Sequence, residues 1–386
     1  MRYLLSIILS ILEKKRITFL SSSSYILAII VFIQFFYYLF FYSRILFYKT
    51  EFTKQKLAIP SVSVIICAHN EKVNLESLIP AILKQRYLNF ELVVMDDRSE
   101  DGSYDYFTKL YKDDSRFRML RIDSIEEGKN PKKYALTKAI EASNNNFLLL
   151  TDADCTPSSE NWISSMTAQL TELKQIVIGY SPYESKGGFL NKLIQYETVY
   201  TAIQYFSFAL AGVPYMAVGR NVLYKKSLFI DNKGFSSHEH ITGGDDDLFI
   251  REVATKENVA CSLVKESFVY SKPKEKFSEW FIQKRRHLSV GTHYKLNHKL
   301  LLGIQLLAHL GFYLLLTVVF WKNMELGLLF FMVRSLGFML IFVLIARKLN
   351  SNYKWVWLLL FIDVVFIFTY TLISTSIVLY KRIKWN

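Results

Sequence analysis

The sequence predicts an α/β domain with a doubly wound, mostly parallel sheet, placed between helices that span a membrane. Two observations lead to this prediction. Of the 386 residues, 51% are hydrophobic, and they concentrate toward the two ends of the chain. In the middle part, apolar runs that end in polar residues alternate with segments of helical spacing, as in parallel sheets flanked by helices.

The first element is a membrane span predicted over residues 22–47, preceded by an N-terminal segment of residues 1–21. The span holds about twenty apolar residues before its only cation, Arg44, which is enough to cross a bilayer. Upstream, Tyr3 to Leu12 is apolar but too short to cross, and no small-residue cleavage site follows it. We expect this stretch to form an interfacial helix.

Three further spans are predicted within residues 300–380, followed by a basic tail of residues 381–386. They run from Leu300 to Trp321, from Leu326 to Ala346 and from Trp355 to Tyr380. Arg334 and Asp363 lie inside two of these spans. Because charge is costly there, we expect each to face a helix partner or a polar cavity, and helix pairing is favoured over catalysis.

The formal net charge of +13 lies mostly beside the predicted spans, which fits anionic lipid headgroups better than nucleic acid. We expect the chain to lie in the plasma membrane. Lysine and arginine clusters near the spans predict that the middle domain is on the cytoplasmic side. With one span before the domain and three after it, however, the cations of both termini would lie on the far side. This conflict with the same rule stays open.

The middle domain, residues 61–292, begins with SVSVIICAHNE, a nearly continuous apolar run of the kind found in strands buried on both faces. The helical stretch NLESLIPAILKQ follows, and FELVVMDDRSEDGS, FRMLRI, KKYALTKAIEAS and NNFLLLTDADC repeat the alternation. Parallel sheets bind ligands at the carboxyl ends of their strands. Those predicted ends carry Asn70, Glu71, Asp96, Asp97, Asp152 and Asp154.

Asp152 and Asp154 form a D-x-D pair directly after a buried strand. Such a pair alone is common in solvated turns. Its position after a buried strand, with Asp97 at the end of a parallel one, favours a functional site. A divalent cation would hold these carboxylates next to a phosphorylated ligand.

Six motifs occur in an order that resembles membrane-bound family 2 glycosyltransferases of the GT-A fold, a group that includes cellulose, chitin and hyaluronan synthases and ceramide glucosyltransferase. They are VSVIICAHNE, VVMDDRSEDGS, GKNPKKYALTKAI, TDADC, GGDDDLF and QKRRH, between Ser61 and about Thr292. The resemblance implies a Rossmann-like GT-A domain in the cytoplasm with transmembrane helices on both sides.

The same resemblance implies a donor site for a nucleotide sugar. Asp97 resembles the acid that hydrogen-bonds the donor base, and the pocket around the nucleotide would be lined by Cys67, Glu71 and Lys132. Asp154, with Asp152 beside it, resembles the pair that holds Mg²⁺ or Mn²⁺ under the diphosphate. A cation there offsets charge as the glycosidic bond breaks.

TGGDDDLFIREVA would carry the general base. In the family that the chain resembles, an acid before a helix takes the proton of the acceptor hydroxyl. The hydroxyl oxygen then attacks the anomeric carbon from the face opposite the leaving group, which inverts the configuration. Aligning LFIREVA places Asp245 at that acid, with Asp246 one residue away as the alternative. The same acids would also cap the helix, so one can be the base while the others cap.

EWFIQKRRHLSVG predicts an amphipathic helix at the membrane surface, with Lys284, Arg285 and Arg286 on its basic face. The resembling family carries Q-x-x-R-W in this helix. Gln283 and Arg286 match the residues that hold the donor diphosphate, whereas His287 replaces the Trp that stacks on the acceptor. We expect His287 to contact the acceptor.

Interface helices are thus predicted at about residues 188–211 and 275–292. Between them, AVGRNVLYKKSLF resembles the acceptor-side segment of the family, in which Arg220 and Asn221 would contact the acceptor or, alternatively, the donor.

The resemblance implies inverting transfer of a sugar, with a UDP-sugar as the first expectation, to a hydroxyl of a membrane lipid. Four spans and His287 favour single transfer over a processive polysaccharide synthase, whose channel is built from more spans. An inactive GT-A scaffold would tolerate loss of the acids, and none is lost. A transporter or receptor would carry functional residues in its spans, where only Arg334 and Asp363 qualify.

Overall fold

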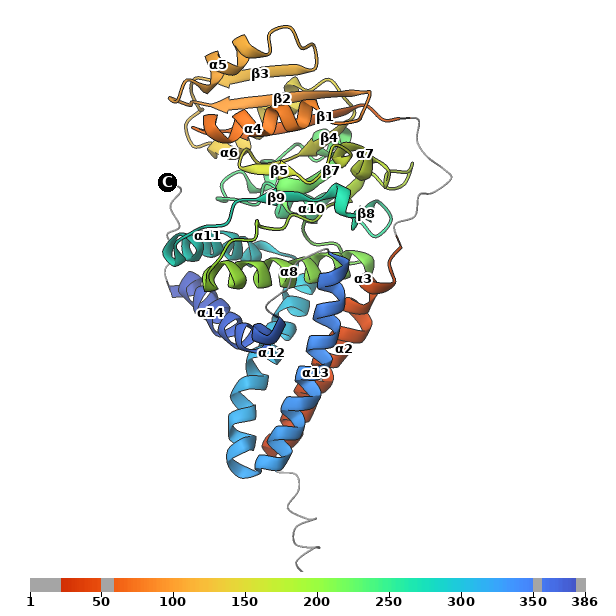
Figure 1. The fold of residues 1–386 in the computed structure, drawn as a ribbon, viewed down its shortest axis with the longest axis vertical. Helices are drawn as coiled ribbons and strands as arrows, with labels where there is room; N and C mark the ends of the chain where they lie inside the picture. The colour runs from red at the N-terminus through yellow and green to blue at the C-terminus, as the bar shows by residue number, and fades with distance from the viewer. Residues whose placement is uncertain (1–21, 50–58, 350–355, 380–386) are drawn as a thin grey trace, which may run out of the picture.

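The computed structural model describes residues 22–49, 59–349 and 356–379. The predicted interfacial helix within residues 1–21 and the basic tail 381–386 lie outside the described residues. Figure 1 shows a sheet domain at one end of the molecule and a bundle of long helices at the other. Between them lie α8 (Phe189–Leu210) and α11 (Phe277–Val290).

The central sheet has seven strands in the order β3-β2-β1-β4-β7-β6-β8. Strands β1 to β4 pair in parallel, and β7 is antiparallel to both of its neighbours. This confirms the predicted mostly parallel, doubly wound sheet. The strands are β1 (Val62–Ala68), β2 (Phe90–Asp97), β3 (Phe117–Ile122), β4 (Phe147–Leu150), β6 (Ile176–Ile178), β7 (Val222–Lys225) and β8 (Val259–Cys261). A small second sheet pairs β5 (Cys155–Pro157) with β9 (Val269–Ser271).

Burial on both faces explains the continuous apolar runs of the central strands. Along β1, Val64 and Ile66 pack in one core with α4, whereas Ile65 packs on the opposite face with α6. Side chains that alternate across a strand therefore all enter an apolar core. The helices on these faces are α4 (Lys72–Leu83), α5 (Ser103–Leu110), α6 (Pro131–Ala142), α7 (Trp162–Thr167), α9 (Lys226–Asp231) and α10 (Asp247–Val253).

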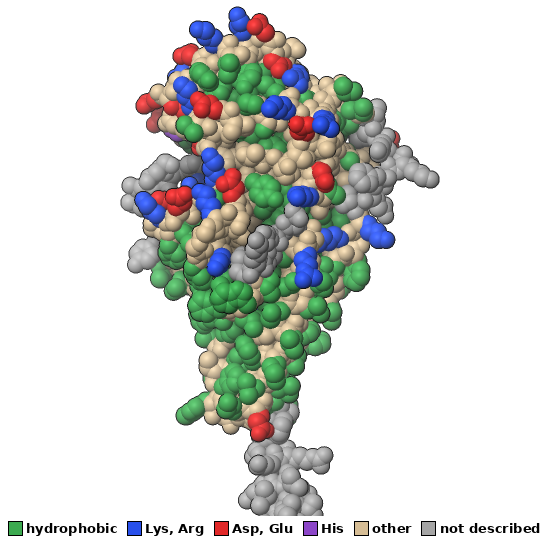
Figure 2. All heavy atoms as spheres, viewed as in Figure 1, with side chains coloured by type: hydrophobic (Ala, Val, Ile, Leu, Met, Phe, Trp, Pro, Cys, Tyr) green, Lys and Arg blue, Asp and Glu red, His purple; other side chains and the backbone are tan. Residues whose placement is uncertain are grey.

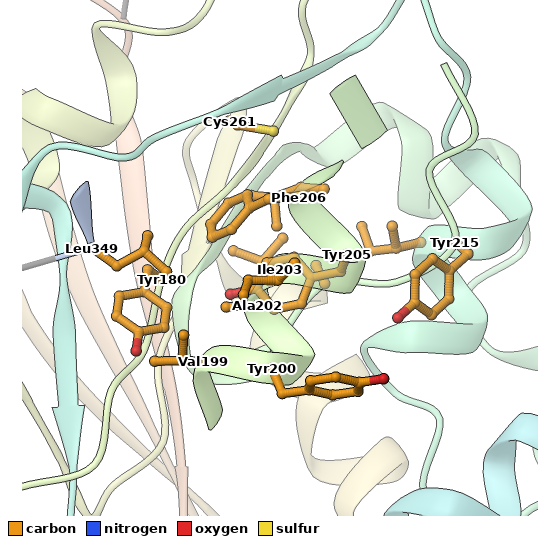
Figure 3. Close-up of a cluster of buried hydrophobic side chains, with 14 of the residues drawn as sticks. Tyr180, Val199, Tyr200, Ala202, Ile203, Tyr205, Phe206, Tyr215, Cys261 and Leu349 are labelled. Atoms are coloured by element: carbon orange, nitrogen blue, oxygen red, sulfur yellow. The ribbon is translucent and has the colours of Figure 1, made fainter. Parts of the chain in front are cut away.

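The helix α8 connects the sheet domain to the bundle because it is buried along most of its length. Figure 3 shows Ile203 and Phe206 of this helix in one apolar cluster with Cys261 of β8 and Leu349, which follows the last helical residue of α13. Residues from the sheet and from the bundle thus share one core. The position of the sheet relative to the bundle is therefore fixed by packing on α8.

Four helical segments are long and apolar enough to cross a membrane: Ser22–Phe47, Leu296–Lys322, Met324–Lys348 and Val356–Leu379. The first consists of α2 (Ser22–Phe36), a π-helical stretch (Tyr37–Tyr42) and α3 (Ser43–Phe47). The others are α12 (Leu296–Lys322), α13 (Met324–Lys348) and α14 (Leu359–Leu379), the last preceded by a short 3₁₀ turn. Figure 2 shows hydrophobic side chains over the bundle surface and cations where the bundle meets the sheet domain.

The four helical segments do not run side by side along their whole length. In Figure 1, α2, α12 and α13 extend away from the sheet domain, whereas α14 lies obliquely next to α8 and α11. Contacts of α14 with α8, α11 and α12 agree with this view. The last apolar helix therefore forms part of the layer under the sheet domain.

The charged residues inside the bundle face partners on neighbouring helices, one of the two surroundings expected for them, and they pair with each other. Arg334 Nη1 lies 2.6 Å from Asp363 Oδ2, and His309 Nε2 lies 3.0 Å from Asp363 Oδ1. The hydroxyls of Tyr196 and Tyr313 also donate to the Asp363 carboxylate. These contacts tie α14 to α8, α12 and α13, and they satisfy charges that burial would otherwise make costly.

Candidate active site

A cavity of about 990 Å³ lies at the carboxyl ends of the strands, where the sheet domain meets the helices. Its wall includes nine of the residues predicted for the site: Lys132, Asp152, Asp154, Arg220, Asp245, Asp246, Gln283, Arg286 and His287. They come from five separate stretches of the chain. The fold therefore gathers into one space most of the residues that the sequence motifs single out.

Asp152 and Asp154 project from the turn that follows β4. One carboxylate oxygen of each, together with the Cys155 sulfur, lie within 4.8 Å of one another. Burial and the neighbouring charge of Asp152 raise the pKa of Asp154. Two close carboxylates that repel each other are the donor set a hard divalent cation prefers, so these residues fit a Mg²⁺ or Mn²⁺ ion.

Lys132, near the start of α6, links the acidic pair to the aspartate triplet. Its Nζ lies 2.9 Å from Asp245 Oδ2 and 3.7 Å from Asp152 Oδ1. Helix α6 begins at this place because Pro131 occupies its first turn and the Asn130 side chain accepts a hydrogen bond from the Lys133 backbone N–H. Burial opposes the charge of Lys132, but the surrounding carboxylates outweigh it and raise the pKa of this lysine.

The three aspartates before α10 differ in their partners. Burial alone would raise the pKa of Asp245, but Lys132 outweighs it and holds that pKa below its ordinary value. Asp246 accepts hydrogen bonds from the backbone N–H groups of Gly219 and Asp247, both at 2.8 Å, and caps the helix. Asp247 accepts a hydrogen bond from the Tyr294 hydroxyl at 2.7 Å.

The pKa values of the last two aspartates shift the other way. Burial first, and then the charge of Asp245, raises the pKa of Asp246. Burial and the charge of Asp246 raise the pKa of Asp247 well above its ordinary range. Of the three carboxylates, Asp245 is therefore the one held ionised by a direct cation.

Two glycines before the triplet shape its approach to the cavity. Gly243 and Gly244 have φ angles of 85° and 78°, in the left-handed region that favours glycine. A Cβ at Gly244 would lie 2.6 Å from a side-chain carbon of Leu248. The positive φ angles and the close packing of this turn on α10 thus favour glycine directly before Asp245.

Helix α11 presents Gln283, Arg286 and His287 to the cavity. The His287 side chain is exposed to the cavity, but desolvation by the surrounding protein and the cations Lys284, Arg286, Arg220 and Lys132 hold its pKa well below the ordinary value. The imidazole is therefore neutral at physiological pH and offers both a donor and an acceptor nitrogen.

Lys284 does not belong to an exposed basic face, so that part of the amphipathic prediction is wrong. Its side chain is buried, and its Nζ lies 2.5 Å from Glu197 Oε2 of α8. Both residues line the cavity. Sequence reasoning missed Glu197, although a single acid in the apolar stretch LIQYETVYTAI was a usable signal.

Of the residues predicted to line the nucleotide pocket, Lys132 lies in the cavity wall, whereas three others do not. Cys67, Glu71 and Asp97 are not among the described residues that line the cavity. Asp97 ends β2 and pairs with Arg98 at 2.8 Å. Burial raises the pKa of Cys67 to about 12, and Lys132, Asp245 and Asp152 are among its charged neighbours. Glu71 has Asp154 among its charged neighbours.

Arg220 and Asn221 were predicted together but have different surroundings. The Arg220 guanidinium lines the cavity and donates to Ser181 and to the Tyr183 hydroxyl. Asn221 is fully buried; it accepts a hydrogen bond from Trp162 Nε1 and donates to the carbonyls of Tyr180 and Ser267. This geometry does not fit an acceptor contact by Asn221, which instead joins neighbouring segments of the core.

The fold and the arrangement of acids define a GT-A domain like those of nucleotide-sugar-dependent glycosyltransferases. Residues 63–232 match the family model described as Glycosyl transferase family 2, and residues 157–379 match the one described as Glycosyl transferase family group 2. The second match covers more than half of the chain. The chain therefore belongs to glycosyl transferase family group 2.

Two relatives are similar to part of the chain. Glycosyltransferase GlyG of Streptococcus pneumoniae is 30% identical over 131 residues, 33% of this chain and 42% of the relative. The GalNAc(5)-diNAcBac-PP-undecaprenol beta-1,3-glucosyltransferase of Campylobacter jejuni is 30% identical over 95 residues, 25% of this chain and 30% of the relative. The chain thus matches less than half the length of these relatives.

One solved structure has a similar fold along nearly the whole chain. Mannosyltransferase PcManGT from Pyrobaculum calidifontis, in complex with GDP-Man and Mn²⁺, superposes with a TM-score of 0.60 at 16% identity. The match covers 93% of this chain and 99% of that one. At this identity the likeness shows a shared fold, including the helices that flank the domain.

Proposed function

We propose that the protein is an inverting glycosyltransferase that moves a sugar from a nucleotide-sugar donor to a hydroxyl of a membrane lipid. The observation that supports this most is the single cavity that holds Asp154, Asp245 and Arg286 and continues among apolar helices. We place the domain on the cytoplasmic side of the plasma membrane, where nucleotide sugars occur, with a UDP-sugar as the first candidate donor.

The donor diphosphate would lie between the D-x-D pair and α11. Asp152 and Asp154 would hold a divalent cation, which when bound neutralises the diphosphate oxygens as the leaving group departs. Gln283 and Arg286 would donate hydrogen bonds to the same oxygens from the opposite wall. The base and ribose would lie toward Asp97, Glu71 and Cys67.

The transfer step would use Asp245 as the general base. The acceptor hydroxyl gives its proton to the Asp245 carboxylate while its oxygen forms a bond to the anomeric carbon. The bond from that carbon to the diphosphate oxygen breaks, and its electron pair leaves with the nucleoside diphosphate. Attack from the face opposite the leaving group inverts the anomeric configuration.

The ion pair with Lys132 keeps Asp245 in the ionised form that a base needs. The same lowering of its pKa makes the carboxylate a weaker base, so the fit to this role rests on its ionised state and its position in the cavity wall. Lys132 also approaches Asp152, so the ammonium group of this lysine would link the base to the metal-binding pair. Asp246 already accepts two backbone hydrogen bonds as a helix cap, which favours Asp245 over its neighbour.

The proposed acceptor is a lipid because the cavity leaves the polar site toward α12 and α14. The Campylobacter relative, by its name, acts on a lipid-linked acceptor. His287, Arg220 and the neighbouring polar side chains would hold the headgroup. A single added sugar is expected, because His287 offers a smaller stacking surface to a growing chain than Trp.

The test uses the full chain purified in detergent, with radiolabelled UDP- and GDP-sugars and membrane lipids as acceptors. We expect a product that extracts into organic solvent and carries one added sugar. Asp245→Asn should bind the donor normally but lower turnover by about a hundredfold or more, with Asp246→Asn as the matched control. A water-soluble polymer would indicate a polysaccharide synthase, and no transfer with any donor would contradict the proposal.

A further inference from the structure

The cavity has an apolar arm that the transfer chemistry does not use. Beyond α11 its wall is formed by Leu302, Gly303 and Leu306 of α12 and by Phe366, Tyr370 and Ile377 of α14. Both helices belong to segments apolar enough to lie in a membrane. The arm is therefore continuous with the aspartates at one end and lies among membrane helices at the other.

The arm reaches the outer surface of the bundle. Val378 lines the cavity and is 73% exposed, and Ser374 lines it one turn earlier. Nearby positions that face outward on the same two helices are also apolar and exposed, Leu307 at 69% and Leu372 at 66%. In a membrane these side chains would contact lipid, so the arm would open toward hydrocarbon.

Gly303 lines the arm. It lies inside α12, where glycine weakens a helix relative to alanine. A Cβ built at this position meets no atom within 4 Å, so no close packing explains the glycine. The space beside it belongs to the cavity.

Another part of the cavity wall is polar. Glu197, Thr201 and Gln204 follow each other along one side of α8 and line the wall. Hydroxyl, amide and carboxylate groups in a row suit a hydroxylated headgroup. A ligand that fills the whole space would thus have a hydroxylated head near Asp245 and an apolar chain between α12 and α14.

We propose that the arm between α12 and α14 holds the hydrocarbon chain of the acceptor lipid, which enters sideways from the bilayer, and that Gly303 sets the width of chain accepted. This inference rests on the proposed function for its substrate. The arm is continuous with the part of the cavity that holds Asp245. A hydrocarbon chain bound in the arm would therefore belong to the same molecule whose hydroxyl approaches Asp245, which is the acceptor lipid.

A bulky residue at position 303 should close the arm. Gly303→Phe is compared with Leu307→Phe, which adds a ring of the same kind to the exposed face of the same helix. Burial of each CH₂ group raises affinity roughly fourfold, so displacing two or more groups should lower transfer to lipid by about tenfold or more. Release of sugar to water, which needs only the donor site, should stay within about twofold of wild type in both variants.

Binding is read independently of activity with a diazirine-bearing long-chain alkyl glucoside in nanodiscs. Labelled peptides should map to α12 and α14 in wild type and in Leu307→Phe, and labelling should fall in Gly303→Phe. Undiminished lipid transfer by Gly303→Phe, or labelling elsewhere in the chain, would overturn the inference. Ser374→Phe, from the facing helix, covers the case in which Gly303→Phe does not fold.

The two proposals fail in different ways. If no nucleotide sugar is hydrolysed or transferred, the proposed function fails whatever the labelling shows. If donor hydrolysis and lipid transfer are both present but neither Gly303→Phe nor Ser374→Phe separates them, only the assignment of the arm fails.

Discussion

Removing the cation beside the proposed base should change the pH dependence of transfer. Lys132→Met leaves Asp245 buried, without the ammonium that lies 2.9 Å from its carboxylate in the wild type. In the wild type this cation holds the pKa of Asp245 below its ordinary value, so the base stays ionised as the pH falls. In the variant, burial would raise the pKa of Asp245, opposed by a backbone hydrogen bond and the more distant charge of Lys133.

The size of the shift follows from the contacts. A carboxylate beside a cation has a pKa lowered by roughly one to three units, and loss of the cation returns that shift. Burial then moves the pKa of Asp245 further upward, above its ordinary value. Activity should therefore be lost, as the pH falls, at a pH that is higher in the variant than in wild type.

The measurement is kcat/KM for the donor with saturating lipid, from about pH 5 to pH 9. Lys132→Arg keeps the positive charge and is the matched control, whose acidic limb should stay where the wild type has it. If Lys132→Met lowers the rate equally at every pH, the lysine only binds the donor and the base is another group. That outcome would refute the assignment of Asp245 by its ion pair.

Three further results are expected. Asp154→Ala, or excess chelator, should abolish transfer, because oxygen ligands at a diphosphate suit Mg²⁺ or Mn²⁺; full activity in either case would exclude a metal at this pair. His287→Ala should lower transfer to lipid more than donor hydrolysis. In the wild type, the pH profiles of both rates should show no change near pH 6.5 from this residue, because its pKa is held well below that value. Arg334→Met should destabilise the detergent-solubilised protein by about 3–5 kcal/mol, since Asp363 would stay buried without its cation. Thermal unfolding measures this change in stability. A stability equal to wild type would show that His309 alone satisfies the carboxylate.

The sequence predicted the sheet because the signal for it is local. Strands buried on both faces are mostly apolar, so β1 and β2 could be recognised without knowing their partners. Acids that follow such strands lie at one edge of a parallel sheet, and this placed Asp152 and Asp154 near each other before any contact was known. Pairing of Arg334 with Asp363 could be expected for a similar reason, since a bundle offers few other ways to satisfy buried charge.

Contacts between distant segments could not be predicted in this way. Lys284 reads as one of three cations on a helix face, and only the approach of Glu197 from α8 shows that it is buried. Asn221 follows Arg220 in a segment that resembles an acceptor site, yet their side chains point into different surroundings. The oblique course of α14 depends on its packing against α8 and α11. The apolar composition of a helix does not show whether it crosses the membrane steeply or lies obliquely, so the course of α14 could not be read from its sequence.

The aspartate triplet shows most clearly why position in a sequence does not define a role. Three adjacent carboxylates have the same chemistry, and a shift of one residue in alignment exchanges base and cap. The fold separates them by giving each a different partner: an ammonium for Asp245, two backbone N–H groups for Asp246 and a tyrosine hydroxyl for Asp247. Because the ammonium favours the charged form most strongly, the negative charge of the triplet is concentrated on Asp245. A proton acceptor is thereby placed at the cavity wall by partners that lie far from it in the chain.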